Sequence, residues 1–190
     1  RTTLGSRVLV LDGAMGTSLY ERDLTIEGDY CGCENCTDIL SRTRPDVVQE
    51  IHESFLAVGC DAVETNSFGS NTLVLGEFDL QAEAYTLSKA AAEIARAACD
   101  AHSTSDKPRF ALGSMGPGTK LITLGQTNWD TLFASYREEA RGLIDGGVDA
   151  LLIETCQDLL QVKVCVNACL AALDEKGKTH EDVPIMVSVT

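Results

Sequence analysis

The sequence predicts an α/β fold of alternating strands and helices, part of a (β/α)8 barrel with about the first five strands present. Short apolar runs rich in β-branched residues alternate with longer amphipathic stretches, the pattern of parallel strands joined by helices. Nearly every predicted strand also ends in polar residues, as expected of a barrel, whose chemistry collects at the carboxyl ends of many strands. The alternative, a doubly wound sheet, concentrates its chemistry at one switch point.

The first half of the chain contains two predicted strands. The segment "RVLVLD", residues 7–12, reads as the first strand. Pro45 can begin a helix whose apolar side chains form one stripe as far as Gly59. The second strand is "DAVET", residues 61–65, and an Ala-rich run of strong helix formers predicts a helix over 81–101.

The second half repeats the alternation with three more strands. A strand and a glycine-rich turn are predicted in "RFALGSMGPG", residues 109–118, followed by a helix over 131–144. The fourth strand is "VDALLIET", residues 148–155, and a helix over 159–173 leads to the fifth, "VPIMVSVT", residues 183–190. A whole barrel needs about 250 residues, so these strands would form its first part and leave a sheet edge open.

Composition narrows the class of protein. With 190 residues, 44% of them hydrophobic, the chain can bury a sizeable core, and we expect one incomplete barrel domain over 1–190. A net charge of −14 without a basic patch argues against nucleic-acid binding. We find no signal peptide and no run near the roughly 18 apolar residues of a membrane span. Cysteines placed singly in apolar runs favour a reducing cytoplasm over a disulfide framework.

Two acids at strand ends indicate a binding site. Asp12 follows the first strand and Glu154 lies at the end of the fourth. Acids that end buried strands at one face of a barrel are costly unless a cation, such as an amine, lies between them. The alternative is that each acid caps a following helix or turn. Other polar residues at the strand ends are Glu64, Thr65, Asn66, Ser114, Thr155, Ser188 and Thr190.

The turn after the first strand, "LDGAMGT", contains Gly13 and Gly16. A dinucleotide fold would have GxGxxG at this place, so nucleotide binding is not favoured. The turn either has a purely structural use or holds an anion, such as a substrate carboxylate, with its backbone amides.

A cysteine cluster, Cys31, Cys33 and Cys36, lies in "DYCGCENCTD". Structural zinc takes four tetrahedral ligands, and no second CxxC or HxxxH follows; the nearest histidine is His52. We therefore interpret the three residues as reduced thiols in a polar loop, with a metal or redox site as the alternative.

Four segments resemble, in order and spacing, the homocysteine-binding (homocysteine S-methyltransferase) domain of cobalamin-dependent methionine synthase: "VLDGAMGTSL", "GCDAVETNSFGSN", "GSMGPGTKL" and "LLIETCQDL". The chain is more distantly similar to betaine–homocysteine methyltransferases. The resemblance implies a (β/α)8 barrel in which zinc binds the homocysteine sulfur as thiolate, which then attacks a methyl group carried by cobalamin.

The resemblance also implies roles for individual residues. Asp12 and Glu154 match the acids that hold the homocysteine ammonium, and the amides of "GAMGT" lie where its carboxylate would be cradled. Thr65 and Asn66 are expected to support the site. The full set expected to bind substrate is Asp12, Gly13, Ala14, Met15, Gly16, Thr17, Thr65, Asn66, Glu154 and Thr155.

The zinc cysteines of the family do not map onto this sequence. They lie in an Asn-Cys motif at strand 6 and a Gly-Gly-Cys-Cys motif at strand 8, and none of the eight cysteines occupies such a motif. Zinc and methylcobalamin are thus expected for the complete enzyme, with zinc ligands outside this chain. We expect the chain alone to be inactive.

The resulting prediction is a cytoplasmic part of methionine synthase that binds homocysteine for methyl transfer from methylcobalamin. Its expected partners are homocysteine, the remaining barrel half, and folate and cobalamin modules of the same or another chain. Two alternatives stay open: a cobalamin-independent homocysteine methyltransferase that uses betaine or S-methylmethionine, and a non-catalytic metal-binding or scaffold fragment that uses the cysteine cluster.

Overall fold

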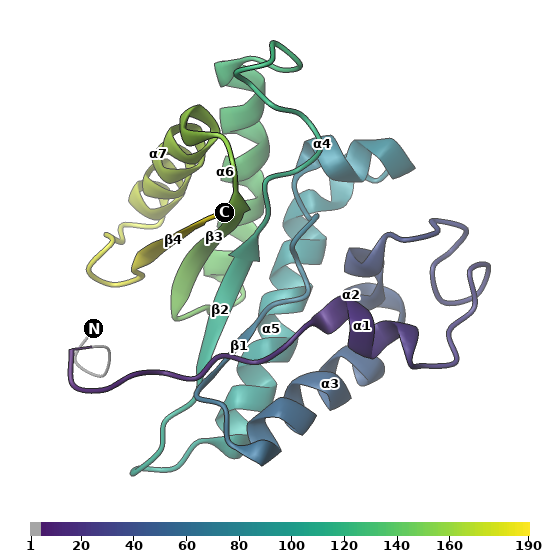
Figure 1. The fold of residues 1–190 in the computed structure, drawn as a ribbon, viewed down its shortest axis with the longest axis vertical. Helices are drawn as coiled ribbons and strands as arrows, with labels where there is room; N and C mark the ends of the chain where they lie inside the picture. The colour runs from purple at the N-terminus through teal and green to yellow at the C-terminus, as the bar shows by residue number, and fades with distance from the viewer. Residues whose placement is uncertain (1–4) are drawn as a thin grey trace.

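One parallel sheet forms the centre of the protein, whose computed structural model describes residues 5–190. Its strands follow the order β1-β2-β3-β4, and every neighbouring pair is parallel. Helices cover one face of this sheet, and the N-terminal segment crosses in front of it (Figure 1). The strands are β1 (Ala62–Glu64), β2 (Phe110–Met115), β3 (Ala150–Cys156) and β4 (Ile185–Val189).

The first predicted strand, residues 7–12, is not a full strand, so the expected number of five is wrong for this chain. The segment runs beside β1 but shares a single parallel bridge with it, between Leu11 and Ala62. The Asp61 side chain explains the difference, because its carboxylate accepts the Val10 N–H at 2.9 Å in place of a strand carbonyl. Arg7 pairs with the same carboxylate at 2.8 Å.

The four long helices agree with the sequence prediction to within a few residues at each end. Proline occupies the first turn of α3 (Pro45–Val58), which ends at Gly59 with φ 111°, the left-handed conformation that glycine adopts without strain. The predicted helix over 81–101 begins as a short 3₁₀ helix and continues as α5. The other long helices are α5 (Ala84–His102), α6 (Trp129–Asp145) and α7 (Leu159–Glu175).

Short helical turns in the loops were not expected from the sequence. They are too short to show a periodic apolar stripe. They comprise α1 (Met15–Tyr20), η1 (Thr37–Ile39), α2 (Leu40–Thr43), α4 (Thr72–Leu75), η2 (Gly76–Phe78) and η3 (Gln81–Glu83).

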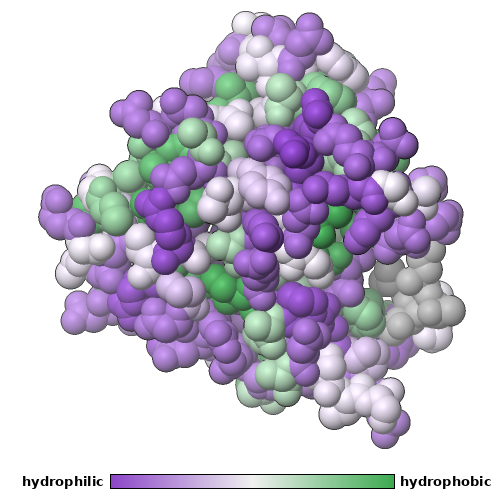
Figure 2. Space-filling model, turned by 180° about the vertical axis from the view of Figure 1, so that it is seen from behind, coloured by the Kyte–Doolittle hydropathy of each residue, from purple (hydrophilic) through white to green (hydrophobic). Residues whose placement is uncertain are grey.

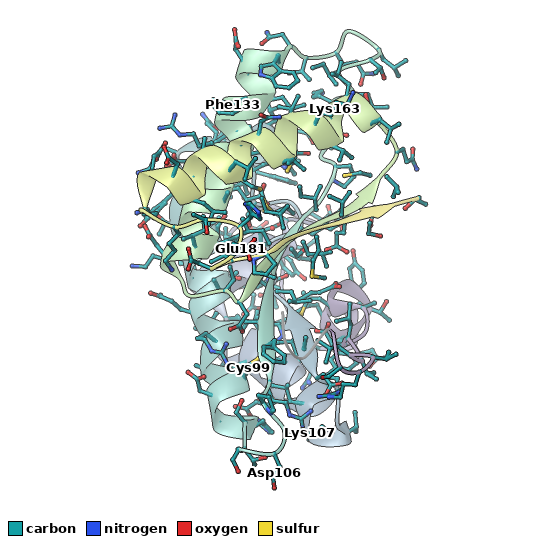
Figure 3. All side chains as sticks on the ribbon, turned by 90° about the vertical axis from the view of Figure 1, so that its left-hand side faces the viewer. Cys99, Asp106, Lys107, Phe133, Lys163 and Glu181 are labelled. Carbon is teal, nitrogen blue, oxygen red and sulfur yellow. The ribbon has the colours of Figure 1, made fainter. Side chains whose placement is uncertain are left out.

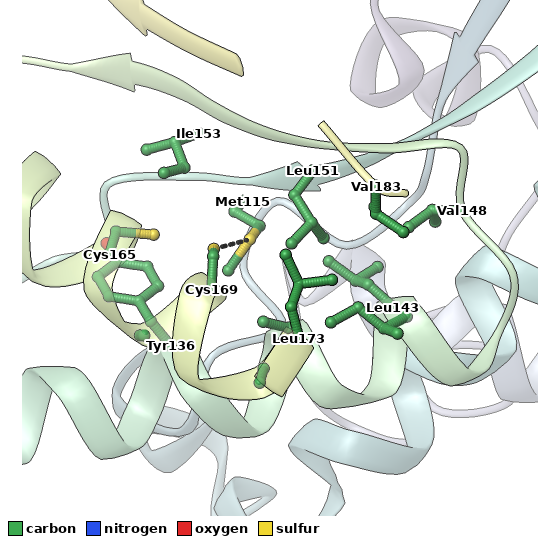
Figure 4. Close-up of a cluster of buried hydrophobic side chains, with 14 of the residues drawn as sticks. Met115, Tyr136, Leu143, Val148, Leu151, Ile153, Cys165, Cys169, Leu173 and Val183 are labelled. Carbon is green, nitrogen blue, oxygen red and sulfur yellow. Dashed lines mark hydrogen bonds between the residues drawn. The ribbon is translucent and has the colours of Figure 1, made fainter. Parts of the chain in front are cut away.

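The main core lies between the sheet and helices α6 and α7. Met115, Tyr136, Leu151 and Ile153 are fully or almost fully buried in it (Figure 4). The Cys169 thiol contacts the Met115 sulfur at 3.6 Å. The cysteines outside the cluster near residue 33 are all buried, which confirms that they behave as small hydrophobes.

The opposite face of the sheet has its own apolar layer. Ala62, Leu112, Ala150 and Leu152 form a buried cluster on it. A cavity of about 380 Å³ adjoins this layer and is also lined by Leu9 and Leu11 of the N-terminal segment. In a closed barrel this face would be the interior.

The two ends of the sheet are distinct. Asp106 and Lys107 lie in the turn beyond α5 at one end, and Phe133 of α6 and Lys163 of α7 lie at the other (Figure 3).

The surface seen from behind is largely hydrophilic with small hydrophobic areas (Figure 2), as expected for a face in water. Within residues 5–190, no helix is long and apolar enough to span a membrane.

Candidate functional site

A pocket of about 490 Å³ opens at the carboxyl ends of the strands. Parallel strands all end at the same edge of a sheet, so the residues that follow them are brought together there. The pocket is lined by Asp12, Gly13, Ala14, Met15, Gly16, Thr37, Glu64, Thr65, Asn66, Ser67, Phe68, Ser114 and Glu154.

Strand alternation places three polar side chains in this pocket. Side chains two residues apart on a strand share a face, and Glu64, Ser114 and Glu154 each lie two residues beyond an apolar residue of the inner layer. The polar residues therefore continue the inner face past the point where the apolar layer ends. The apolar residues that precede them are Ala62, Leu112 and Leu152.

Asp12 is held at the pocket by β1. Its two carboxylate oxygens accept the backbone N–H of Glu64, at 3.1 and 3.2 Å. Burial raises the pKa of Asp12 to about 7, and the negative charges of Glu64 and Glu154 add to the rise. A positively charged ligand would stabilise the ionised form of this carboxyl group.

Glu154 faces the same space from β3. The Ser114 hydroxyl donates a hydrogen bond to its carboxylate. A β-bulge interrupts the pairing of β3 with β4 between Ile153 and Cys156, and Thr155 within it has φ 57°. A β-branched residue in this left-handed conformation is strained, and such strain is often found at functional sites. The bulge leaves Thr155 exposed and outside the pocket.

Glu64 is the third acid of the pocket. Burial raises its pKa to about 7, and Glu154 contributes to the rise. Within the part of the chain that the structure describes, no lysine, arginine or histidine lines the pocket. Three carboxyl groups thus converge without a cationic side chain, an arrangement suited to a ligand that carries an ammonium group.

Thr65 and Asn66 line the pocket, but their polar atoms are engaged within the protein. The Thr65 hydroxyl accepts the backbone N–H of Ser114 at 2.9 Å. The Asn66 amide donates to the Thr37 carbonyl at 2.8 Å. Both side chains are almost fully buried, at 3% and 4% exposure. They connect the end of β1 to β2 and to the segment at Thr37.

The glycine turn forms one wall of the pocket. Helix α1 begins within this turn, at Met15, and Ala14 at the N-cap supplies no side-chain hydrogen bond to the first helical N–H groups. A Cβ atom at Gly13 would lie 3.0 Å from the Phe55 ring, so a side chain there would require the ring to shift. Thr17 is exposed and does not line the pocket.

Thr17 and Thr155 are thus the two expected residues that the structure does not bring into the pocket. Several lining residues were absent from the expected set. Glu64 and Ser114 carried a usable signal, since both are polar residues at strand ends in the same register as Glu154. Thr37, Ser67 and Phe68 come from loops and had no comparable pattern.

The cysteine cluster lies beside the site and does not form part of it. All three are free cysteines, and Cys31 is exposed, but Cys36 is only 2% exposed and packs in a core cluster. Burial raises the pKa of the Cys36 thiol to about 12. Over residues 5–190, no group of three or more histidine, cysteine, aspartate or glutamate side chains is placed to hold a metal ion. The side chains present therefore do not fit a zinc centre.

Fold and sequence together define the class: the chain belongs to the homocysteine S-methyltransferase family, whose sequence model matches residues 9–190. It is 47% identical over 188 residues to the methionine synthase of Mycobacterium leprae (strain TN), covering 99% of this chain and 15% of that protein. Identity to the methionine synthase of Mycobacterium tuberculosis (strain ATCC 25618 / H37Rv) is 46% over 187 residues, covering 98% and 15%. The chain thus spans about 15% of the length of these relatives.

Solved structures show the same fold. The metallated form of the homocysteine methyltransferase MmuM from Escherichia coli matches with a TM-score of 0.72 at 21% identity, covering 94% of this chain and 63% of that one. Its apo form matches with a TM-score of 0.70 at 20% identity, covering 100% and 62%. The predicted fold class is confirmed, with four parallel strands of the barrel in this chain.

Proposed function

We propose that the chain is part of a methionine synthase and that its pocket binds homocysteine for methyl transfer to the substrate sulfur. The observation that carries this proposal is the convergence of Asp12, Glu64 and Glu154 in a pocket without a basic side chain. Methionine synthases that are 46–47% identical to nearly the whole chain support this assignment over a cobalamin-independent enzyme or a scaffold.

The acids would hold the substrate ammonium. Asp12 and Glu154 approach the pocket from two different segments and are each fixed by a hydrogen bond, from the Glu64 N–H and the Ser114 hydroxyl respectively. A positive group between partly buried carboxylates offsets the free energy that their desolvation costs. The geometry therefore orients the amino acid by its ammonium before the sulfur reacts.

The turn at Gly13, Ala14, Met15 and Gly16 would receive the substrate carboxylate. Its backbone N–H groups are the only donors that the turn can offer, and the uncapped start of α1 leaves them available to an anion. The ammonium and carboxylate would then be fixed at neighbouring parts of the same wall. The part of the pocket away from these two groups would hold the side chain that carries the sulfur.

We assign activation of the sulfur to other parts of the complete enzyme. Zinc and methylcobalamin are the expected cofactors of that enzyme, and residues 5–190 supply no fitting zinc ligands. The role derived for this chain is to bind and orient the substrate. It includes exclusion of water from the ammonium by Phe68 at the pocket rim, where this side chain is 47% exposed.

The rest of the barrel would complete the site. Strand β4 is paired on one side only, and Val187 and Val189 are exposed on it, at 44% and 60%. Further strands pairing with this edge would also cover the apolar inner face. The remaining barrel half, with folate and cobalamin modules, is the partner that we propose.

Methyl transfer by the complete protein tests the proposal. Methylcobalamin, betaine and S-methylmethionine would each be offered as donor with homocysteine, and methionine would be quantified by mass spectrometry. We expect methionine with methylcobalamin and none with the other two donors. Turnover with betaine or S-methylmethionine alone would replace this assignment with the cobalamin-independent one.

A further inference from the structure

Glu64 belongs to the group of acids on which the proposed function rests, but that function gives this residue no role of its own. A homocysteine molecule brings one ammonium group, and Asp12 and Glu154 are sufficient to hold it. Glu64 nevertheless lines the same pocket, on the inner face of β1. Its presence adds a third negative charge for which the substrate offers no second cation.

The position of Glu64 ties it to both other acids. Its backbone N–H donates to the Asp12 carboxylate at 3.1 Å, so these residues are adjacent at the pocket wall. Its side chain lies near enough to Glu154 for the two charges to interact. Asp12 and Glu154 both accept hydrogen bonds from the protein, whereas among residues 5–190 no donor is found for the Glu64 carboxylate.

The groups that face Glu64 are either negatively charged or neutral. Asp12 approaches from the N-terminal segment and Glu154 from β3, and the Cys60 thiol lies near Asp12. Three ionised carboxyl groups in one pocket repel one another. In the absence of a ligand, it is therefore favourable for one of the carboxyl groups to stay protonated. Burial places the pKa values of both Asp12 and Glu64 at about 7, which agrees with this expectation. The remaining polar residues of the wall are neutral: Thr37, Thr65, Asn66, Ser67 and Ser114.

We propose that Glu64 is a positioning residue which exchanges a proton for the substrate ammonium. This inference rests on the proposed function. Without substrate, Asp12 and Glu64 share one proton. When the ammonium enters, it takes the place of that proton, which leaves to solvent, and both carboxyls are then ionised around the amine. No bond in the substrate changes in this step, and one positive charge replaces another.

Proton exchange makes homocysteine affinity depend on pH. Protons compete with the ammonium, so the affinity of the wild-type protein falls by roughly tenfold from about pH 7.5 to about pH 6, beyond the fall that loss of the thiol proton on zinc gives every variant. Replacement of Glu64 by Gln removes one proton site and one negative neighbour of Asp12. The pKa of Asp12 then falls, and the variant keeps only the pH dependence that comes from the thiol.

Isothermal titration calorimetry of the complete protein tests this role. Homocysteine is titrated in phosphate and in Tris, two buffers with different ionisation enthalpies, so that the difference in heat reports the protons released. The thiol proton lost on zinc is common to every variant, so we expect the wild type to release a substantial fraction of one further proton near pH 7. This additional release should be much smaller in Glu64→Gln and restored in Glu64→Asp. The exposed Glu27→Gln variant is the matched control and should behave as the wild type.

Two results would overturn the role of Glu64 alone. One is proton release by the wild type no greater than the single proton that the thiol loses on zinc, which requires no variant to fold. The other is a Glu64→Gln protein with the proton release and pH profile of the wild type. Absence of homocysteine binding by the wild type at every pH would instead overturn the proposed function, and this inference with it.

Discussion

The backbone N–H of Glu64 donates a hydrogen bond to the carboxylate of Asp12, at 3.1 and 3.2 Å to its two oxygens. This contact joins the N-terminal segment to the end of β1 where the segment itself makes only one bridge to the strand. It fixes Asp12 at the pocket, and it places two acids with raised pKa values side by side.

Removing one charge from the ammonium site should weaken substrate binding. We expect Asp12→Asn and Glu154→Gln each to cost about 2–5 kcal/mol of homocysteine binding, the range for truncating one side of a buried charge pair. Zinc content should not change, because neither acid belongs to a metal-ligand group in the described residues. Titration of homocysteine into the metal-loaded variants measures both quantities. Wild-type affinity in both variants would refute the assignment, and a loss of folding stability alone would return both acids to structural roles.

The cysteine cluster should divide into two classes. Cys31 is exposed and Cys33 partly so, and their joint replacement by Ser should leave homocysteine binding and stability unchanged. Cys36→Ser should lower the free energy of unfolding by about 1–3 kcal/mol, because it buries a hydroxyl in an apolar cluster. Urea unfolding of the two variants makes the comparison. Loss of bound zinc from the Cys31/Cys33 variant would show instead that the loop is a metal site.

His52 should make the fold sensitive to acid. The ring is fully buried and has no hydrogen-bond partner among residues 5–190, and burial lowers its pKa from 6.5 to about 4. A lowered pKa contributes stability that is present above pH 6.5 and lost as the pH falls toward 4. The loss between pH 7 and about pH 5 should be about 2 kcal/mol.

Replacement of His52 by Leu tests this pH dependence. Its unfolding free energy should change less between pH 7 and about pH 5 than that of the wild type, as measured by urea unfolding. His180→Gln, at an exposed position, is the matched control and should keep the wild-type dependence. Equal pH dependence in His52→Leu and the wild type would contradict the explanation.

Glu139 should have the opposite dependence. It is fully buried on α6, and neither carboxyl oxygen has a hydrogen-bond partner in the part of the chain that the structure describes. Burial raises its pKa well above the ordinary value. A raised pKa contributes stability at low pH that is lost as the pH rises. Glu139→Gln should therefore stabilise the protein more at pH 8 than at pH 5 in thermal unfolding, and the exposed Glu34→Gln should show no such difference. Equal gains at pH 5 and pH 8 would show that the carboxyl is ionised in the fold.

Sequence alone was sufficient to predict the four long helices and to single out Asp12 and Glu154, two of the acids of the pocket. The apolar stripes of the four long helices need only local periodicity, and Asp12 and Glu154 stand out because acids are costly at the ends of buried strands. Glu64 has the same signal and was not included in the expected site. Counting the two-residue alternation from Ala62 would have placed it on the inner face.

The features that sequence did not predict depend on tertiary contacts. The first strand is reduced to one bridge because the Asp61 carboxylate takes the Val10 N–H, a long-range contact with no local pattern. Thr155 leaves the pocket because of a bulge in β3, and a bulge has no fixed residue signature. Cys36 is buried by packing against residues distant in sequence.

A direct test of the central claim compares two ligands of the complete protein. Homocysteine and 4-mercaptobutanoate share the thiol and the carboxylate, but only homocysteine has an ammonium group. If Asp12, Glu64 and Glu154 form an ammonium site, calorimetric titration should show 4-mercaptobutanoate binding weaker by at least about thirtyfold, the lower end of the loss expected for one side of a buried charge pair. Equal affinities of the two ligands would contradict the account.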